Sequence, residues 1–124
     1  MIIDHINICA PSATIESVKD FYCKLFDLEV GFRPTFSRPG YWLYSDGKPI
    51  IHLTESNKHV SSLEHGYLDH VAFSHSGLDK IIGKLNALDI IYSTSYVAAL
   101  NVTQVFFKDP AGIKIEIDFK NEVL

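Results

Sequence analysis

Two histidines, each preceded by an aspartate, occur in matching contexts in the two halves of this 124-residue chain. Asp4-His5-Ile6-Asn7 returns in altered form as Asp69-His70-Val71-Ala72, 65 positions later. Each copy lies in a run in which apolar and polar residues alternate, the pattern of a half-buried strand. The repetition predicts that His5 and His70 have the same role, and such a pair suggests a shared metal ion.

The end of each half carries a further potential ligand. Gly47-Lys48-Pro49-Ile50-Ile51-His52 aligns with Gly112-Ile113-Lys114-Ile115-Glu116 after a slip of one residue, since His52 and Glu116 are 64 positions apart. Imidazole and carboxylate ligands suit Fe, Mn, Zn or Ni, and two histidines with one carboxylate are typical of non-haem Fe(II). One carboxylate leaves a divalent ion with a net positive shell, which favours an anionic, bidentate small-molecule substrate such as an enolate, catecholate or phosphonate.

The same duplication appears in the expected secondary structure. The first half predicts a strand over 2–9, a helix from about Ser12 to Phe26, and strands around 28–34, 40–45 and 49–55. The second predicts a strand over 67–74, a helical stripe over 78–88, and strands over 90–95, 103–107 and 113–119. We therefore expect one α+β domain, 1–124, with a βαβββ module over about 1–56, a linker over about 57–66, and a second module over about 67–124.

Composition limits the range of functions. The formal net charge is −4 and the cationic residues are scattered, which argues against nucleic-acid binding and against a basic membrane-binding patch. Only two cysteines occur, without metal-type spacing, and no apolar run approaches the ~20 residues of a membrane helix. A cytoplasmic protein that acts on a small molecule is the expectation.

Several motifs together resemble the vicinal oxygen chelate superfamily, which contains glyoxalases, bleomycin-resistance proteins and extradiol dioxygenases. The motifs are Asp4-His5-Ile6, Phe21-Tyr22-Cys23-Lys24-Leu25-Phe26, Leu68-Asp69-His70-Val71-Ala72-Phe73, and the closing segment from Phe107 to Glu116. The resemblance covers essentially the whole chain. It implies two curved half-barrel sheets around a cleft, and a homodimer whose modules pair within one chain or are exchanged between two. It also implies a divalent metal ion held by residues of the first and last strands, here His5, His52, His70 and Glu116.

The resemblance leaves the reaction open. Glyoxalase I members commonly carry a carboxylate where His52 stands, whereas extradiol dioxygenases and fosfomycin-modifying enzymes use a His, His, Glu set that maps onto His5, His70 and Glu116. A lyase or isomerase would use Glu116 as the catalytic base, and a ring-cleaving dioxygenase would keep it on the metal. The alternative is a metal-free small-molecule binding protein like the bleomycin-resistance members.

Further polar and aromatic residues are candidates for contacting the substrate. Some share strand faces with the ligands, and two arginines precede the third predicted strand, where they could grip an anionic tail. The candidates are Asn7, Arg33, Arg38, Trp42, Tyr44, Ser74, Gln104 and Lys114, with Asp118 beside Glu116.

Overall fold

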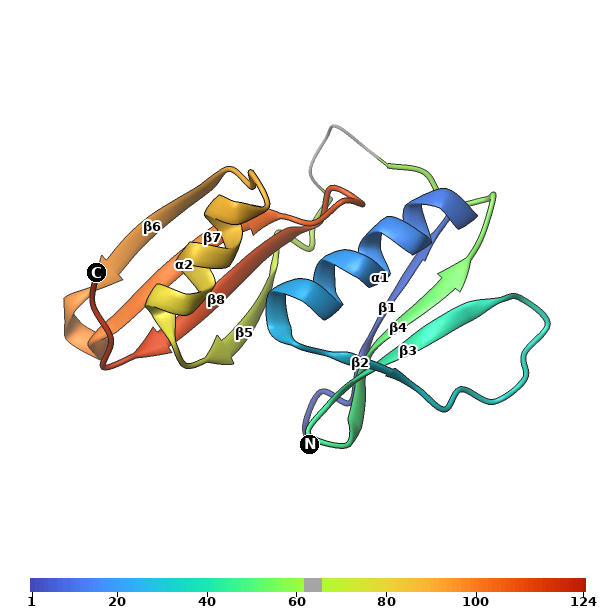
Figure 1. Ribbon diagram of the computed structural model, residues 1–124, viewed down its shortest axis with the longest axis horizontal. Coiled ribbons are helices and arrows are strands. Elements are labelled where there is room, and N and C mark those ends of the chain that lie inside the picture. The colour runs from blue at the N-terminus through green and yellow to red at the C-terminus, as the bar shows by residue number, and fades with distance from the viewer. Residues whose placement is uncertain (62–65) are drawn as a thin grey trace. The chain divides into compact units, whose positions relative to one another are not determined.

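The computed structural model describes residues 1–61 and 66–124, and the chain divides into two compact units, Met1–Ser61 and Ser62–Leu124. Part of the predicted linker, residues 62–65, lies outside the described residues. Within the described ranges, each unit contains four strands and one α-helix in the order βαβββ (Figure 1). The predicted α+β fold of two tandem βαβββ modules is confirmed.

The first unit is one sheet with a helix packed on it. Its elements are β1 (Ile6–Ala10), α1 (Ser12–Phe26), β2 (Glu29–Gly31), β3 (Gly40–Ser45) and β4 (Lys48–Glu55). The strand order is β1-β4-β3-β2, with β1 parallel to β4 and the other pairs antiparallel. The buried face of α1 contacts β1, β3 and β4 and consists of Ile15, Val18, Phe21, Tyr22 and Leu25.

The second unit repeats this arrangement. Its elements are β5 (Val71–His75), α2 (Leu78–Ala87), β6 (Tyr92–Val97), a short 3-10 turn η1 (Ala98–Leu100), β7 (Val102–Lys108) and β8 (Lys114–Lys120). The strand order is β5-β8-β7-β6, the counterpart of the order in the first unit. Alternate residues of β8, from Ile115 through Ile117 to Phe119, are fully buried, and α2 buries Leu78, Ile81 and Leu85.

Strand pairing shows that the two modules are equivalent at the candidate ligands. His52 of β4 lies opposite Asn7 of β1, two residues after His5. Glu116 of β8 lies opposite Ala72 of β5, two residues after His70. The one-residue slip required by the sequence comparison therefore leaves His52 and Glu116 at the same register position.

Two side chains hold the ends of elements in the second unit. The Glu122 carboxylate accepts hydrogen bonds from the backbone N–H groups of Gly77 and Leu78, at 3.0 and 2.7 Å, and so caps the start of α2. The buried Asp109 accepts from the N–H groups of Ala111 and Ile113, at 2.9 and 3.0 Å. This second contact fixes the turn from which β8 begins.

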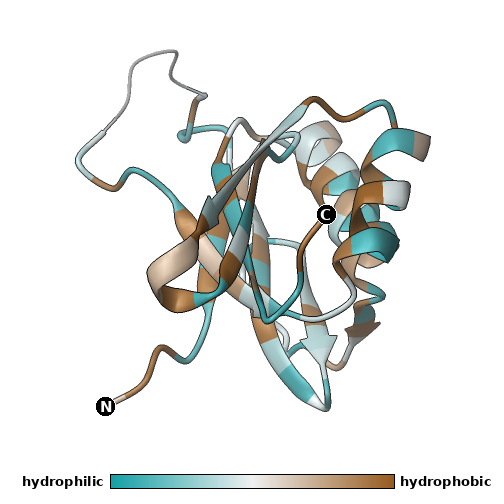
Figure 2. Ribbon diagram, turned by 90° about the vertical axis from the view of Figure 1, so that its left-hand side faces the viewer, coloured by the Kyte–Doolittle hydropathy of each residue, from teal (hydrophilic) through white to brown (hydrophobic). Residues whose placement is uncertain are grey.

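The strands that carry the first histidines begin later than predicted. β1 begins at Ile6 rather than at residue 2, and β5 begins at Val71 rather than at residue 67, so His5 and His70 immediately precede their strands. The alternating pattern was misleading because pairing with β4 starts only at Ile6 and pairing with β8 only at Val71. Ile2 and Ile3 are consequently exposed, and Figure 2 shows this hydrophobic segment at the free N-terminal end.

No helix within the described residues combines the length and the apolar character needed to cross a membrane.

Candidate functional site

His70 and Glu116 form a close pair in the second unit. Nε2 of His70 lies 2.8 Å from Oε2 of Glu116. The pair forms because β5 and β8 run parallel and side by side, with Glu116 opposite Ala72. An imidazole nitrogen and a carboxylate oxygen, both common metal ligands, thus lie adjacent.

The orientation of His70 is set by its neighbour in sequence. Nδ1 of His70 lies 2.7 Å from Oδ2 of Asp69, and that hydrogen bond lowers the pKa of the Asp69 carboxyl, with Lys114 contributing. The ammonium of Lys114 is 3.5 Å from the same oxygen and 5.4 Å from the centre of the Phe106 ring. A carboxylate on Nδ1 fixes the tautomer that leaves Nε2 available to a metal.

Glu116 is a buried carboxylate with three polar neighbours. Its side chain is 8% exposed, and Gln104 donates a hydrogen bond of 2.5 Å to Oε1 and a longer one of 3.3 Å to Asp118. Burial raises the pKa of Glu116, the nearby Asp118 raises it further, and His70 and Gln104 oppose the rise. The structure thus gives Gln104 a role as an orienting partner of Glu116.

The first unit repeats the acid-histidine contact but not the second pair. Nδ1 of His5 lies 2.6 Å from Oδ2 of Asp4, which lowers the pKa of Asp4. The His52 ring, however, lies flat on the His5 ring, with centres 3.7 Å apart and planes 9° from parallel. An imidazole nitrogen binds a metal through a lone pair in the plane of its ring, so the stacked faces of His5 and His52 take no part in ligation.

Two further contacts fix His52 in this orientation. Its Nε2–H donates to the carbonyl of Pro49 at 3.1 Å, and its other face stacks on Trp42 with ring centres 4.0 Å apart. Burial lowers the pKa of His52, and His5 lowers it further. His52 is therefore kept neutral, and binding a metal through Nε2 would require it to release Pro49.

A small hollow lies beside this ring stack in the first unit. It has a volume of about 270 Å³ and is lined by Asn7, Arg33, Phe36, Ser37, Arg38, Trp42, His52 and Thr54. Four of the predicted substrate contacts, Asn7, Arg33, Arg38 and Trp42, come together here. Their use in binding a substrate stays a prediction.

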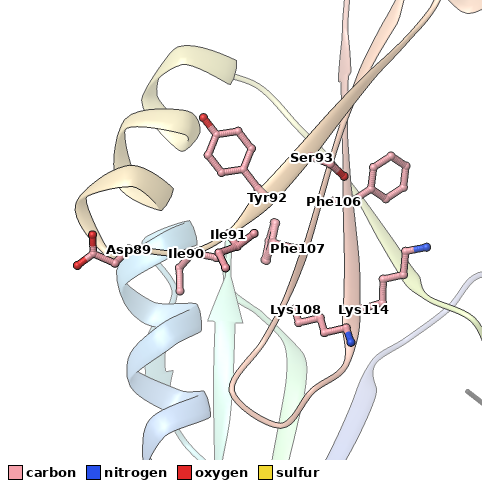
Figure 3. Close-up of a pocket in the computed structure, with 9 residues that line it drawn as sticks. All are labelled: Asp89, Ile90, Ile91, Tyr92, Ser93, Phe106, Phe107, Lys108 and Lys114. Carbon is pink, nitrogen blue, oxygen red and sulfur yellow. The ribbon is translucent and has the colours of Figure 1, made fainter. Parts of the chain in front are cut away.

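A larger hollow of about 610 Å³ lies in the second unit. Its lining residues come from β6, the turn before it, β7 and the start of β8 (Figure 3). Figure 3 shows Phe106 and Phe107 pointing to opposite sides of β7, as strand alternation requires. Phe106 also meets the His70 ring edge to face, with centres 6.4 Å apart, so it belongs to the surroundings of the candidate ligand pair.

The donor atoms fit a divalent ion as two pairs, one in each unit. Within the residues that the structure describes, no group of three or more His, Cys, Asp or Glu side chains is gathered to hold a metal. The chemistry of each pair nevertheless suits one, because both histidines have Nδ1 held by an aspartate and Nε2 turned away from it. Of the four predicted ligands, His52 has its Nε2–H on the carbonyl of Pro49, and Nε2 of His70 faces Glu116; metal binding by the four stays a prediction.

The remaining predicted substrate contacts have other surroundings. The Tyr44 hydroxyl donates to the carbonyl of Phe32 at 2.5 Å, so Tyr44 supports the β2–β3 loop, and it is not among the residues that line the small hollow. Ser74 is exposed on β5, opposite Asp118. Lys114 contacts Asp69 and also lines the larger hollow of the second unit.

Several residues around these sites were not predicted. Thr54 donates to Asn7 at 3.2 Å, Phe36 lines the small hollow, and Phe106 lies against His70. Phe106 could have been found, because it follows Trp42 by the same 64 positions that separate His52 from Glu116. Phe36 gave no such signal, since its loop has no counterpart pattern in the second half.

No protein family model matches this sequence, and no curated protein matches it either. Solved structures do match. The chain is similar to a putative glyoxalase family protein from Bacillus anthracis, with 23% identity and a TM-score of 0.76, covering 97% of this chain and 95% of that one. It is similar to a glyoxylase/bleomycin resistance protein/dioxygenase domain from Frankia sp. EAN1pec, with 17% identity and a TM-score of 0.77, covering 100% and 95%.

A third match is a mutant of the fosfomycin resistance protein FosX from Listeria monocytogenes, complexed with Mn(II) and 1S,2S-dihydroxypropylphosphonic acid. The identity is 16% and the TM-score 0.73, over 97% of this chain and 94% of that one. These likenesses define the class of fold. The chain has the glyoxalase-like fold that these structures share.

Proposed function

We propose that this chain is a divalent-metal-dependent enzyme acting on a small, oxygen-chelating substrate. His5, His70 and Glu116 are the proposed ligands, and His52 is a conditional fourth. The observation that carries the proposal is the duplicated Asp-His contact, at 2.6 Å in one unit and 2.7 Å in the other, with Glu116 at 2.8 Å from the second histidine. A purely structural histidine needs no such repeated carboxylate on Nδ1.

The chemistry of Glu116 supports a reaction that moves a proton. When bound, a divalent ion would stabilise negative charge on the substrate oxygens. A carboxylate whose pKa is raised is a better proton acceptor near neutral pH than an ordinary one. Gln104 holds one oxygen of Glu116, leaving the other toward His70. A lyase or isomerase reaction uses Glu116 as the base, and a dioxygenase uses it only as a ligand.

The match to FosX with Mn(II) and a phosphonic acid supports a divalent metal and an anionic substrate as the first choices to test. The metal identity among Mn, Fe, Zn and Ni is left to measurement.

Metal content after purification is the first test. We expect about one divalent ion for each complete set of His5, His70 and Glu116. The metal affinity should be lost in His5→Ala and in Glu116→Ala. His59→Ala is the matched control, because His59 lies outside both ligand pairs and contacts Ser56. Unchanged affinity in both ligand variants would refute the proposal.

Activity assays separate the reaction classes. The protein is loaded anaerobically with Fe(II) for oxygen uptake on catechols, and with Mn(II), Zn(II) or Ni(II) for a glyoxalase-type assay. Oxygen uptake with ring opening would establish a dioxygenase and displace the lyase reading. A protein that binds a small ligand but no metal would be the metal-free binding protein instead.

A homodimer belongs to the proposal, and mixing experiments test whether modules are exchanged within it. If His5 and His52 of one chain act with His70 and Glu116 of another, mixing His5→Ala with Glu116→Ala chains restores one intact site per heterodimer. Without exchange, mixing restores nothing.

A further inference from the structure

The small hollow of the first unit carries a concentrated positive charge. Arg33 and Arg38 both line it, and no Asp or Glu is among its lining residues. The rest of the lining consists of neutral polar and aromatic side chains. An anion is the ligand that two guanidinium groups favour, because they present forked N–H donors to oxyanions.

Arg33 has a donor that the protein does not use. Its Nη2 donates to the carbonyl of Arg38 at 3.1 Å, and its guanidinium lies 4.8 Å from the centre of the Phe36 ring. Its Nε, by contrast, is buried and has no hydrogen-bond partner within residues 1–61 and 66–124. Buried donors are nearly always satisfied, so this N–H calls for an acceptor that the described part of the chain does not provide.

The aromatic lining favours a flat ligand body. Trp42 presents one face to His52 and lies 6.2 Å from Phe36, ring centre to ring centre. Asn7 and Thr54, already joined by a hydrogen bond, add polar groups across β1 and β4. Because sites for drug-sized ligands occupy roughly 300–1,000 Å³, a hollow of about 270 Å³ suits a ligand the size of one substituted ring.

We propose that this hollow is a binding site for a small aromatic oxyanion, with Arg38 and the unsatisfied Nε–H of Arg33 on the charged group and with Trp42 and Phe36 beside the ring. The site deepens the proposed function, on which it rests, by naming the substrate class. His52 joins the two sites, because it lines the hollow and stacks on the proposed ligand His5.

Trp42 makes this site directly observable, since it is the one tryptophan of the sequence. We would titrate the metal-free protein, in EDTA, with benzoate, phenylphosphonate and the uncharged benzamide while recording tryptophan emission. The expected result is a saturable change in emission with at least one oxyanion. Benzamide should bind at least about tenfold more weakly than that oxyanion, which is the difference that one charge-assisted contact makes. Equal binding of benzamide, or no saturable change with either oxyanion, overturns the proposal.

Arginine variants then test which side chains bind the charged group of the ligand. Arg38→Gln should weaken oxyanion binding about tenfold and remove the preference over benzamide, and Arg33→Lys should weaken it while keeping the net charge. Lys24→Gln, in the last turn of α1, is the control for a general loss of charge and should bind as the unmodified protein does. Circular dichroism confirms folding of each variant. Unchanged selectivity in both arginine variants would overturn the proposal.

These results are separable from those of the metal experiments. Oxyanion binding by a protein that takes up no metal would refute the enzyme and leave this site standing. Stoichiometric metal binding without oxyanion binding would refute this anion site and leave the proposed metal-dependent enzyme standing.

Discussion

Nε2 of His70 and Oε2 of Glu116 are 2.8 Å apart, a distance at which these two atoms can share a proton, and the proposed metal ion must bind both. Metal and proton therefore compete for the same pair. Metal affinity should rise with pH, and binding should release a proton to the buffer. Calorimetry in buffers of different ionisation enthalpy measures this release directly. A metal affinity independent of pH between about 5 and 8 would contradict the assignment of this pair.

Glu116 should cost the metal-free protein stability. Because its pKa is raised in the folded state, its contribution is present below the ordinary value of 4.5 and is lost as pH rises through the raised pKa. In Glu116→Gln the side chain has nearly the same size but is neutral at every pH. We expect urea unfolding at pH 7 to show a higher free energy of unfolding for this variant, with the difference shrinking toward pH 4. Glu29→Gln, exposed on β2, is the control and should show no such trend.

The two aspartates should matter to metal binding without touching the metal. Asp4→Asn and Asp69→Asn each remove the carboxylate from a histidine Nδ1, and loss of such a partner typically lowers metal affinity about 10–100-fold. Asp20→Asn removes the same charge from α1, where Asp20 contacts Lys19, and should have little effect. Equal affinities in all three variants would mean that the Asp-His contacts do not serve a ligand role.

Trp42 should report the protonation of His52. The pKa of His52 is lowered from 6.5, chiefly by burial, so its contribution to stability is present above pH 6.5 and is lost as pH falls through the lowered pKa. Since the two rings stack at 4.0 Å, an imidazolium should change the tryptophan emission with a midpoint below 6.5. His52→Gln should lack this transition and His59→Ala should keep it. Metal loading that abolishes the transition would identify His52 as a ligand, and an unchanged transition would exclude it.

Glu122 should stabilise the second unit through the start of α2. Glu122→Ala leaves the Gly77 and Leu78 N–H groups without their acceptor, and loss of a helix cap typically costs about 1 kcal/mol. Glu122→Gln retains one acceptor oxygen and should lose less. Urea denaturation of the two variants measures the difference, and equal stability of Glu122→Ala and the unmodified protein would contradict the capping role.

Local patterns were sufficient for most of the fold. The apolar stripes of α1 and α2 predicted both helices because burial on one face is what such a stripe requires, and Gly112 and Pro110 marked the turn before β8. Ser12 and Thr14 are residue types that favour an N-cap, but neither caps α1, since Pro11 occupies that position and no side chain caps the helix. Proline is suited there because its fixed φ is compatible with a helix start.

The site depended on contacts that no local pattern encodes. The Asp-His repeat selected His5 and His70 as candidates, but it did not indicate that His52 would give its Nε2–H to Pro49 and stack between two rings. The small hollow depends on the conformation of the β2–β3 loop, which the Tyr44 hydroxyl and the Arg33 guanidinium hold through backbone carbonyls. Such contacts between side chains and distant backbone follow from the folded loop and not from residue spacing.

The shared register position of His52 and Glu116 also has an evolutionary consequence. The duplicated module contains this register position twice, as His52 in β4 and as Glu116 in β8. The side chain at either copy can change without disturbing the backbone pairing of its strand. A neutral ring in one copy and an acid in the other give two chemically different positions on nearly identical modules. Exchanging a single side chain at either copy would alter the charge offered to a ligand, so new chemistry in this architecture requires a point mutation rather than a new backbone.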